Sequence, residues 1–246
     1  MEKVRATYTW GFIGPGAGGE DNEQGRWQRL LPPDVRQVNV GLGISDYTVE
    51  GVDEAIVRYP DCVDRLIEKG AQRVVLGGVP ICSQLGRARV LQLSKEAEQR
   101  TGVLADSTNE AIIAAFERLG VKRVAIASRW ADQLNKAMVD YFAEAGIATG
   151  SVTSEGQWAA QGSAMSIEEG IVMSIRLGRE AKRQAGDADA ILLPGGAWRS
   201  LTAIPILEDE FGIPVVTNNN ARAWRIIDAG MAPPLKGWGR LLANAR

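Results

Sequence analysis

The chain of 246 residues contains no histidine and only two cysteines, Cys62 and Cys82. Without imidazole it can build neither a Ser-His-Asp nor a Cys-His nucleophile system, nor a histidine-ligated zinc or iron site. The glycine-rich stretch from Gly14 to Gly19 has neither the spacing of a dinucleotide-binding motif nor a following Walker lysine. We therefore expect no nucleotide, no other cofactor and no metal, and any proton chemistry must come from other groups.

Basic residues are not in excess, and long apolar runs are missing. Lys and Arg total 28 against 30 Asp and Glu, a net charge of -2 without a basic block, so nucleic acid is not an expected partner. No run approaches the roughly 20 apolar residues of a membrane helix, and the first residues do not resemble a signal sequence. We expect a cytoplasmic protein without a membrane partner. The oligomeric state stays open, a homo-oligomer included.

Short apolar runs alternate with amphipathic segments along the chain. Hydrophobic residues make up 45% of the sequence, enough for a sizeable core. The predicted strands are 38–43, 73–76, 103–105, 123–127, 190–193 and 213–216. The predicted helices are 52–69, 87–100, 109–119, 132–145, 166–185, 203–211 and 221–229. This alternation predicts an α/β fold with parallel sheets covered by helices.

The second half of the chain repeats features of the first. Residues 73–78 can be laid on 191–196, each a short strand that ends in a glycine pair. Residues 102–111 can be laid without gaps on 212–221, each a strand followed by Ser or Thr and then Asn. Any two strand–helix units look somewhat alike, but two such pairs in the same order favour an internal duplication.

The length and the repeat together predict two pseudo-symmetric lobes, each a short parallel sheet flanked by helices. We place residues 1–115 plus 225–246 in the first lobe and 116–224 in the second. Ligands of parallel sheets bind at the carboxyl ends of the strands, so we expect the active site in the cleft between the lobes. Glycine pairs and helix amino termini at these ends would hold a small anion such as a carboxylate.

Short motifs follow one another over nearly the whole chain. They are residues 11–18, 41–48, 74–78, 119–128, 190–196, 203–205, 212–216 and 237–240. In this order and spacing they resemble the aspartate/glutamate racemase superfamily, and within it the arylmalonate decarboxylase and maleate isomerase branch. The resemblance implies a cofactor-independent lyase or isomerase that acts on a small, aromatic or cyclic carboxylate.

Enzymes of this kind use cysteines at the carboxyl end of a strand in one or both lobes. The matching positions here are Gly78 and Gly195, so both thiols are missing and we predict a mechanism without them. The resemblance further implies a cradle of backbone N–H groups that holds the carboxylate. Its matching residues are Gly78, Val79, Trp130, Gly195 and Gly196, to which we add Gly14 and Pro15 of the first glycine-rich motif.

Three residues are candidates for the acid or base. Asp46 and Tyr47 follow the second strand of the resemblance, at a sheet end where a partly buried carboxylate can transfer protons, although most loop acids are solvated. Cys82 lies four residues after Gly78, about one helical turn, and is either a relocated thiol or a small buried hydrophobe.

Further binding candidates stand at strand ends. Thr108, Asn109 and Asn218 are either helix caps or donors to an oxyanion. Trp198 and Arg199 directly follow the second glycine pair, where an indole would contact a planar substrate and a guanidinium would bind its carboxylate.

Three functions remain open at this point. The leading hypothesis is a lyase or isomerase that works through an enediolate-like intermediate held by the two glycine turns. A second is a hydrolase or hydratase in which a carboxylate such as Asp46 activates a water molecule in the same cleft. The third is a non-catalytic protein that binds a small carboxylate.

Overall fold

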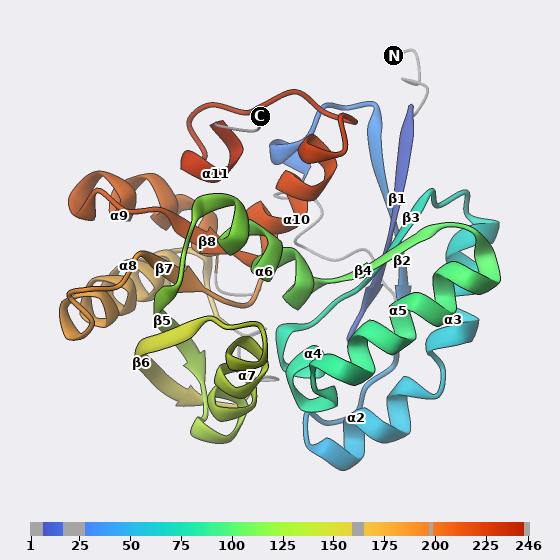
Figure 1. Ribbon diagram of the computed structural model, residues 1–246, viewed down its shortest axis with the longest axis horizontal. Helices are drawn as coiled ribbons and strands as arrows, with labels where there is room; N and C mark the ends of the chain where they lie inside the picture. The colour runs from blue at the N-terminus through green and yellow to red at the C-terminus, as the bar shows by residue number, and fades with distance from the viewer. Residues whose placement is uncertain (1–6, 17–27, 159–164, 197–198, 244–246) are drawn as a thin grey trace. The chain divides into compact units, whose positions relative to one another are not determined.

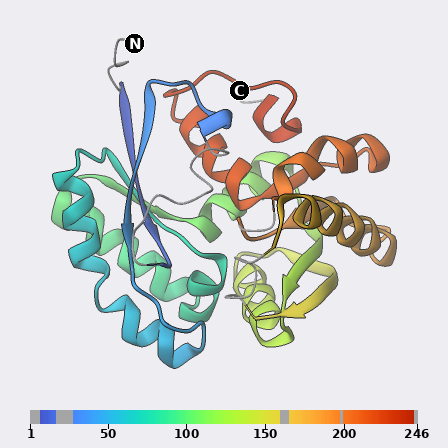
Figure 2. The ribbon, with the colours of Figure 1, turned by 180° about the vertical axis from the view of Figure 1, so that it is seen from behind.

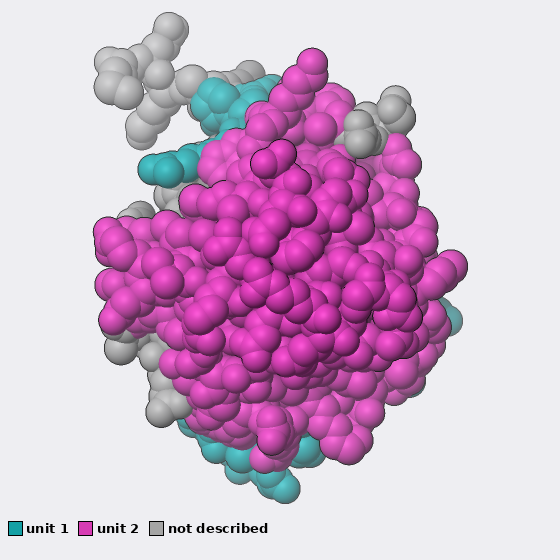
Figure 3. Space-filling model, turned by 90° about the vertical axis from the view of Figure 1, so that its left-hand side faces the viewer, with its two compact units in different colours: residues 1–110 teal, residues 111–246 magenta. Residues whose placement is uncertain are grey.

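The computed structural model of the protein describes residues 7–16, 28–158, 165–196 and 199–243. The chain divides into two compact units, Met1–Glu110 and Ala111–Arg246, which Figure 3 colours separately. The boundary falls inside helix α6 (Thr108–Leu119). None of the described helices is long and apolar enough to cross a membrane.

The first unit is built on a four-stranded parallel sheet with the order β2-β1-β3-β4 (Figure 1). Its strands are β1 (Tyr8–Gly14), β2 (Val35–Gly41), β3 (Arg73–Leu76) and β4 (Leu104–Ser107). Its helices are η1 (Gln28–Leu30), α2 (Val49–Ile56), α3 (Tyr59–Glu68), α4 (Val79–Leu85) and α5 (Arg87–Thr101). Strand β3 is buried along its whole length, as its apolar run predicts for a central parallel strand.

The second unit repeats this design with the strand order β6-β5-β7-β8. Its strands are β5 (Arg123–Trp130), β6 (Ala148–Gln157), β7 (Ala190–Leu193) and β8 (Val215–Thr217). Its helices are α7 (Asp132–Glu144), α8 (Ile167–Gln184), η3 (Ser200–Thr202), α9 (Ala203–Phe211), α10 (Asn218–Asp228) and α11 (Arg240–Ala243). Helix α8 packs along β5, β6 and β7, as Figure 2 shows from behind. The predicted α/β fold with two helix-flanked parallel sheets is therefore confirmed.

The strand registers correct one detail of the predicted repeat. Ser107 pairs with Leu76 in the first sheet, and its counterpart Thr217 pairs with Leu193 in the second. Leu76 is therefore equivalent to Leu193, one residue away from the predicted superposition. The shift makes Gly78 the counterpart of Gly195, because each lies two residues beyond its strand.

The predicted helix 52–69 is wrong as a single element, since it divides into α2 and α3. Pro60 near the start of α3 has no N–H to continue the hydrogen bonding of a preceding helix. The break also frees Arg58, whose Nε and Nη2 donate to the carbonyl oxygens of Leu42 and Gly43, both at 2.8 Å. These bonds fix the loop that follows β2.

Strands β1 and β6 were not among the predicted strands. The β6 sequence is mostly polar and only Thr153 of this strand is buried, because β6 lies at the edge of the second sheet and packs one face only partly. Because β6 has no apolar run, the pattern that predicts buried strands does not identify it.

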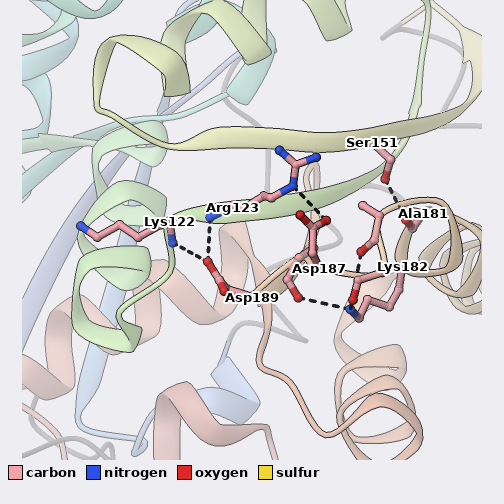
Figure 4. A network of polar contacts seen from close by, with 10 residues as sticks. Lys122, Arg123, Ser151, Ala181, Lys182, Asp187 and Asp189 are labelled. Carbon is pink, nitrogen blue, oxygen red and sulfur yellow. Dashed lines mark hydrogen bonds and ion pairs between the residues drawn. The ribbon is translucent and has the colours of Figure 1, made fainter.

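A polar network fixes the amino end of β5 (Figure 4). The Asp189 carboxylate accepts the backbone N–H groups of Lys122 and Arg123, both at 2.8 Å. Asp187 pairs with the Arg123 guanidinium at 3.0 Å. The Lys182 ammonium donates to the carbonyl oxygen of Gly186 at 2.5 Å, just beyond α8. This bonding holds the sheet at the end opposite to its candidate ligand-binding edge.

The carboxyl-terminal segment belongs to the second unit in this division of the chain, whereas the sequence placed 225–246 with the first lobe. Its backbone is bonded there: the Glu208 carboxylate of α9 accepts the N–H of Arg240 at 2.9 Å and that of Val215 at 2.9 Å. Arg240 in turn donates to the carbonyl oxygen of Gly212 at 2.6 Å.

Candidate active site

Each unit has a glycine in an unusual backbone conformation just beyond its central strand. Gly78 follows β3 with φ of 94°, and Gly195 follows β7 with φ of 93°. Side chains with a Cβ rarely adopt such values, whereas glycine does so at little cost. The same turn therefore occurs twice, at the carboxyl end of the equivalent strand in each sheet.

The space that a side chain would need at these glycines is filled by a neighbour. A Cβ at Gly78 would lie 2.9 Å from Cδ1 of Ile81, and one at Gly195 would lie 3.0 Å from Cζ2 of Trp130. Both distances are too short for an ordinary contact. A residue with a side chain would thus need both a strained backbone and a displaced neighbour.

Thr108 and Asn109 begin helix α6, directly after β4. Both are buried, and neither Thr108 Oγ1 nor Asn109 Oδ1 has a hydrogen-bond partner among the described residues. The amide nitrogen of Asn109 donates to Ser83 Oγ at 3.0 Å, which fixes this side chain against α4. Helix α6 is capped instead by Ser107, whose Oγ accepts the N–H of Glu110 at 3.1 Å. Buried polar atoms usually have partners, so the two orphan atoms keep Thr108 and Asn109 as candidates for ligand contact.

Cys82 lies inside α4 and is fully buried. Its Sγ contacts the carbonyl oxygen of Leu76 at 3.8 Å. Burial raises the pKa of the thiol to about 12, although the backbone N–H of Asn109 and the hydroxyl of Ser107 oppose this shift. The thiol is protonated near neutral pH, which favours the interpretation of Cys82 as a buried hydrophobe over that of a relocated base.

Asp46 and Tyr47 lie in the loop between β2 and α2 and are partly exposed. The Asp46 carboxylate accepts the N–H of Tyr47 at 2.7 Å, and the carbonyl oxygen of Tyr47 accepts the side chain of Gln84 at 3.0 Å. Gln84 belongs to α4, the helix that starts at the Gly78 turn with the buried Val79. The structure thus ties the predicted acid to the element that carries the first glycine turn.

Gly14 and Pro15 lie at the end of β1 and bond to the same loop. The carbonyl oxygen of Gly14 accepts the N–H of Leu42 at 2.8 Å, and that of Pro15 accepts the N–H of Ile44 at 2.9 Å. In the first unit, the predicted residues of β1, the β2 loop and the Gly78 turn therefore share one edge of the sheet.

In the second unit, Trp130 ends β5 and is 2% exposed. Asn135 donates to its carbonyl oxygen at 2.7 Å, but the indole Nε1 has no partner among the described residues. Asn218, which follows β8, is also buried, and its Oδ1 has no hydrogen-bond partner among the described residues. Gly196 and Arg199 follow the second glycine, whereas Trp198 lies outside the described residues.

Two arginines at this edge were missed by the sequence analysis. Arg129 precedes Trp130 and is 4% exposed, and Arg222 lies in α10 and is 1% exposed. Arg222 donates to Asn219 Oδ1 at 2.5 Å. Asn219 and Arg222 are three residues apart, which places them on one face of α10, and this spacing was the available signal in the sequence. Burial itself could not be predicted from the sequence.

A two-unit α/β protein with one glycine turn at each central strand and orphan polar atoms at the adjacent strand ends belongs to a class that binds small molecules. The sequence model of the arylmalonate decarboxylase family matches residues 10–242. The chain therefore belongs to the arylmalonate decarboxylase family, and the predicted resemblance is confirmed.

Individual relatives agree with this assignment. The chain is 30% identical over 238 residues to arylmalonate decarboxylase from Bordetella bronchiseptica, covering 96% of this chain and 97% of that one. A structure of unliganded arylmalonate decarboxylase is 30% identical with a TM-score of 0.83, over 97% and 100% of the two chains. A Nocardia farcinica maleate cis-trans isomerase with a covalently bound succinylcysteine intermediate has a TM-score of 0.79 at 19% identity, over 96% and 98%. These named relatives are enzymes of the lyase and isomerase types.

Proposed function

We propose that the protein is a cofactor-independent enzyme that cleaves a small malonate-like carboxylate through an enediolate-like intermediate. The observation that carries the proposal is the pair of equivalent glycine turns, Gly78 and Gly195, in a chain 30% identical to an arylmalonate decarboxylase over nearly its full length. Backbone N–H groups at such turns approach an anion closely, because no side chain intervenes.

The cysteines favour decarboxylation over an isomerisation of the maleate type. The Nocardia relative carries a succinylcysteine intermediate, which requires a cysteine that substrate can reach. In this chain Cys62 and Cys82 are both buried, and burial raises the pKa of each thiol. A mechanism without a thiol is therefore the simpler one for this protein.

In the proposed reaction the bond between the central carbon and one carboxylate of a malonate breaks. Carbon dioxide leaves, and the electron pair of the broken bond enters the remaining carboxylate, which becomes an enediolate. Donors around a glycine turn, such as backbone N–H groups and the indole N–H of Trp130 beside Gly195, stabilise the growing charge on its oxygens. A proton from Asp46, Tyr47 or water then adds to the carbon and gives the monocarboxylate, so that one proton is consumed for each carbon dioxide released.

The first prediction concerns Gly78→Val. The valine side chain collides with Ile81 and strains the turn, so turnover should be abolished. The assay follows phenylmalonate, methylmalonate and maleate by NMR in deuterated water, where the wild-type protein should place deuterium at the new C–H bond.

Gly70→Val is the matched control, because Gly70 has φ of 83° and no atom within 4 Å of an added Cβ. It carries a similar backbone strain away from the site and should keep its turnover. Wild-type kinetics in the Gly78 variant would contradict the placement of the site. Hydration of maleate, with no cleavage of either malonate, would point to the hydratase hypothesis instead.

A further inference from the structure

Arg199 is held in a backbone conformation that arginine rarely adopts. Its φ is 65°, and among the described residues it is the one non-glycine residue with a positive φ. Such a conformation is strained and persists where the surroundings enforce it, often at binding sites. Arg199 directly precedes η3.

Among the described residues, the guanidinium of Arg199 lacks the partners that other arginines of the unit have. Its Nε is buried with no hydrogen-bond acceptor in that part of the chain, and no carboxylate there lies within 4.0 Å. By contrast, Arg123 pairs with Asp187 and Arg179 with Glu210. A partly buried guanidinium that has no counter-charge among the described residues suits a carboxylate supplied by a ligand.

Two further buried groups, at Ser200 and beside Gly195, are also hydrogen-bond donors. Ser200, the residue after Arg199, is 1% exposed and its Oγ has no partner among the described residues. The indole of Trp130 contacts Gly195, and its buried Nε1–H also has no partner among the described residues. An indole N–H and a guanidinium can only donate, and a hydroxyl can donate as well. Strand β5 ends at Trp130 and its parallel neighbour β7 ends shortly before Gly195, so Trp130 and the glycine turn lie at one edge of the second sheet, and Arg199 and Ser200 follow that turn in the sequence.

We propose that Arg199, together with Ser200, binds a second anionic group of the substrate that is not part of the reacting malonate unit. The substrate class is then a malonate whose substituent carries its own carboxylate, and the product is a dicarboxylate. This inference rests on the proposed function. Arg199 acts as a binding residue that selects the substituent.

Carboxymethylmalonate and isobutylmalonate test this selection, because their substituents have the same branching and only the first is charged. Calorimetry gives Kd and a steady-state assay gives kcat and KM for both compounds. Wild-type protein should bind carboxymethylmalonate more tightly. Arg199→Gln should weaken that binding by about tenfold or more and leave isobutylmalonate unchanged, with the loss in KM rather than in kcat.

Two further variants separate this role from a structural one. Arg199→Gly relieves the positive φ, so it should melt no lower than wild type and still lose the preference for the charged substituent. Arg183→Gln, an exposed arginine of α8, should behave as wild type. An equal effect of Arg199→Gln on both compounds, or a wild-type preference for isobutylmalonate, overturns the inference.

The outcomes distinguish this inference from the proposed function. Selective binding of carboxymethylmalonate without its decarboxylation would overturn the function and support the role of Arg199. Cleavage of both malonates with no selectivity would support the proposed function and overturn the role of Arg199. Failure of the wild-type protein to bind either compound would overturn both.

Discussion

At the scale of single residues, the Trp130 side chain has two roles, packing against Gly195 and presenting a hydrogen-bond donor, which a substitution can separate. The indole ring fills the space beside the glycine, and its Nε1–H is a buried donor. Trp130→Phe keeps an aromatic ring and removes the donor. We expect kcat/KM to fall by about a hundredfold to a thousandfold, as for loss of one oxyanion donor.

The control for this variant is Trp10→Phe. Trp10 is a buried core residue of β1 that pairs in register with Arg73, the first residue of β3, and so lies far from the carboxyl end of that strand. It should lower the midpoint of thermal unfolding while kcat/KM stays at the wild-type value. If instead Trp130→Phe melts earlier but turns over normally, the indole serves packing alone.

Residue types at strand ends gave several candidate binding residues. Thr108, Asn109 and Asn218 were chosen from their positions after predicted strands and Trp130 from the family resemblance, and each has a buried polar atom without a partner among the described residues. The environment of Cys82 could not be predicted in this way, because its burial depends on how α4 packs and not on its spacing from the glycine.

At the scale of elements, Glu208 connects α9 to β8 and to the carboxyl-terminal segment through two backbone N–H groups. Burial raises the pKa of this carboxyl above the ordinary value of 4.5, and the N–H groups of Val215 and Arg240 oppose the shift less strongly. The folded protein therefore binds this proton more tightly than the unfolded chain does. Its contribution to the free energy of unfolding is present below pH 4.5 and decreases as the pH rises through the folded-state pKa.

Glu208→Gln removes this titration and makes the expectation measurable. Urea unfolding of both proteins at pH 4.5 and pH 7 gives the stability of wild type relative to the variant. That relative stability should decrease at the higher pH, because only the wild-type side chain must become charged in a buried site. An increase would show that the two N–H donors outweigh burial and that the pKa is lowered.

Some elements were predicted with their exact bounds, whereas β1 and β6 were missed. Strands β3 and β7 and helix α9 have the predicted bounds, because each is followed directly by a glycine or a proline. Strand β6 is polar because it lies at a sheet edge, and its pairing with β5 comes from backbone hydrogen bonds that carry no sequence pattern. Local sequence patterns identify buried segments, whereas an edge strand such as β6 is set by its tertiary contacts.

At the scale of the whole molecule, the two units share one strand order, which makes the internal duplication more than a chance likeness of strand–helix units. The strand register then equates Gly78 with Gly195, which the superposition of sequences missed by one residue. A gapless match of short strands cannot fix register, because apolar residues in buried strands are interchangeable. That both glycines replace catalytic thiols of the family stays a prediction.

The composition of the whole chain also sets an expectation for metal removal. The chain has no histidine, its two cysteines are buried, and among the described residues no three Cys, Asp or Glu side chains gather as metal ligands would. Protein treated with a chelator and dialysed to a metal content below one ion per hundred chains, roughly, should therefore cleave its malonate substrate at an unchanged rate. Elemental analysis and the decarboxylation assay on the same sample provide the measurement. Loss of turnover that one added divalent metal restores would mean that substrate and protein carboxylates share an ion, and the thiol-free mechanism would then need that ion to stabilise the enediolate.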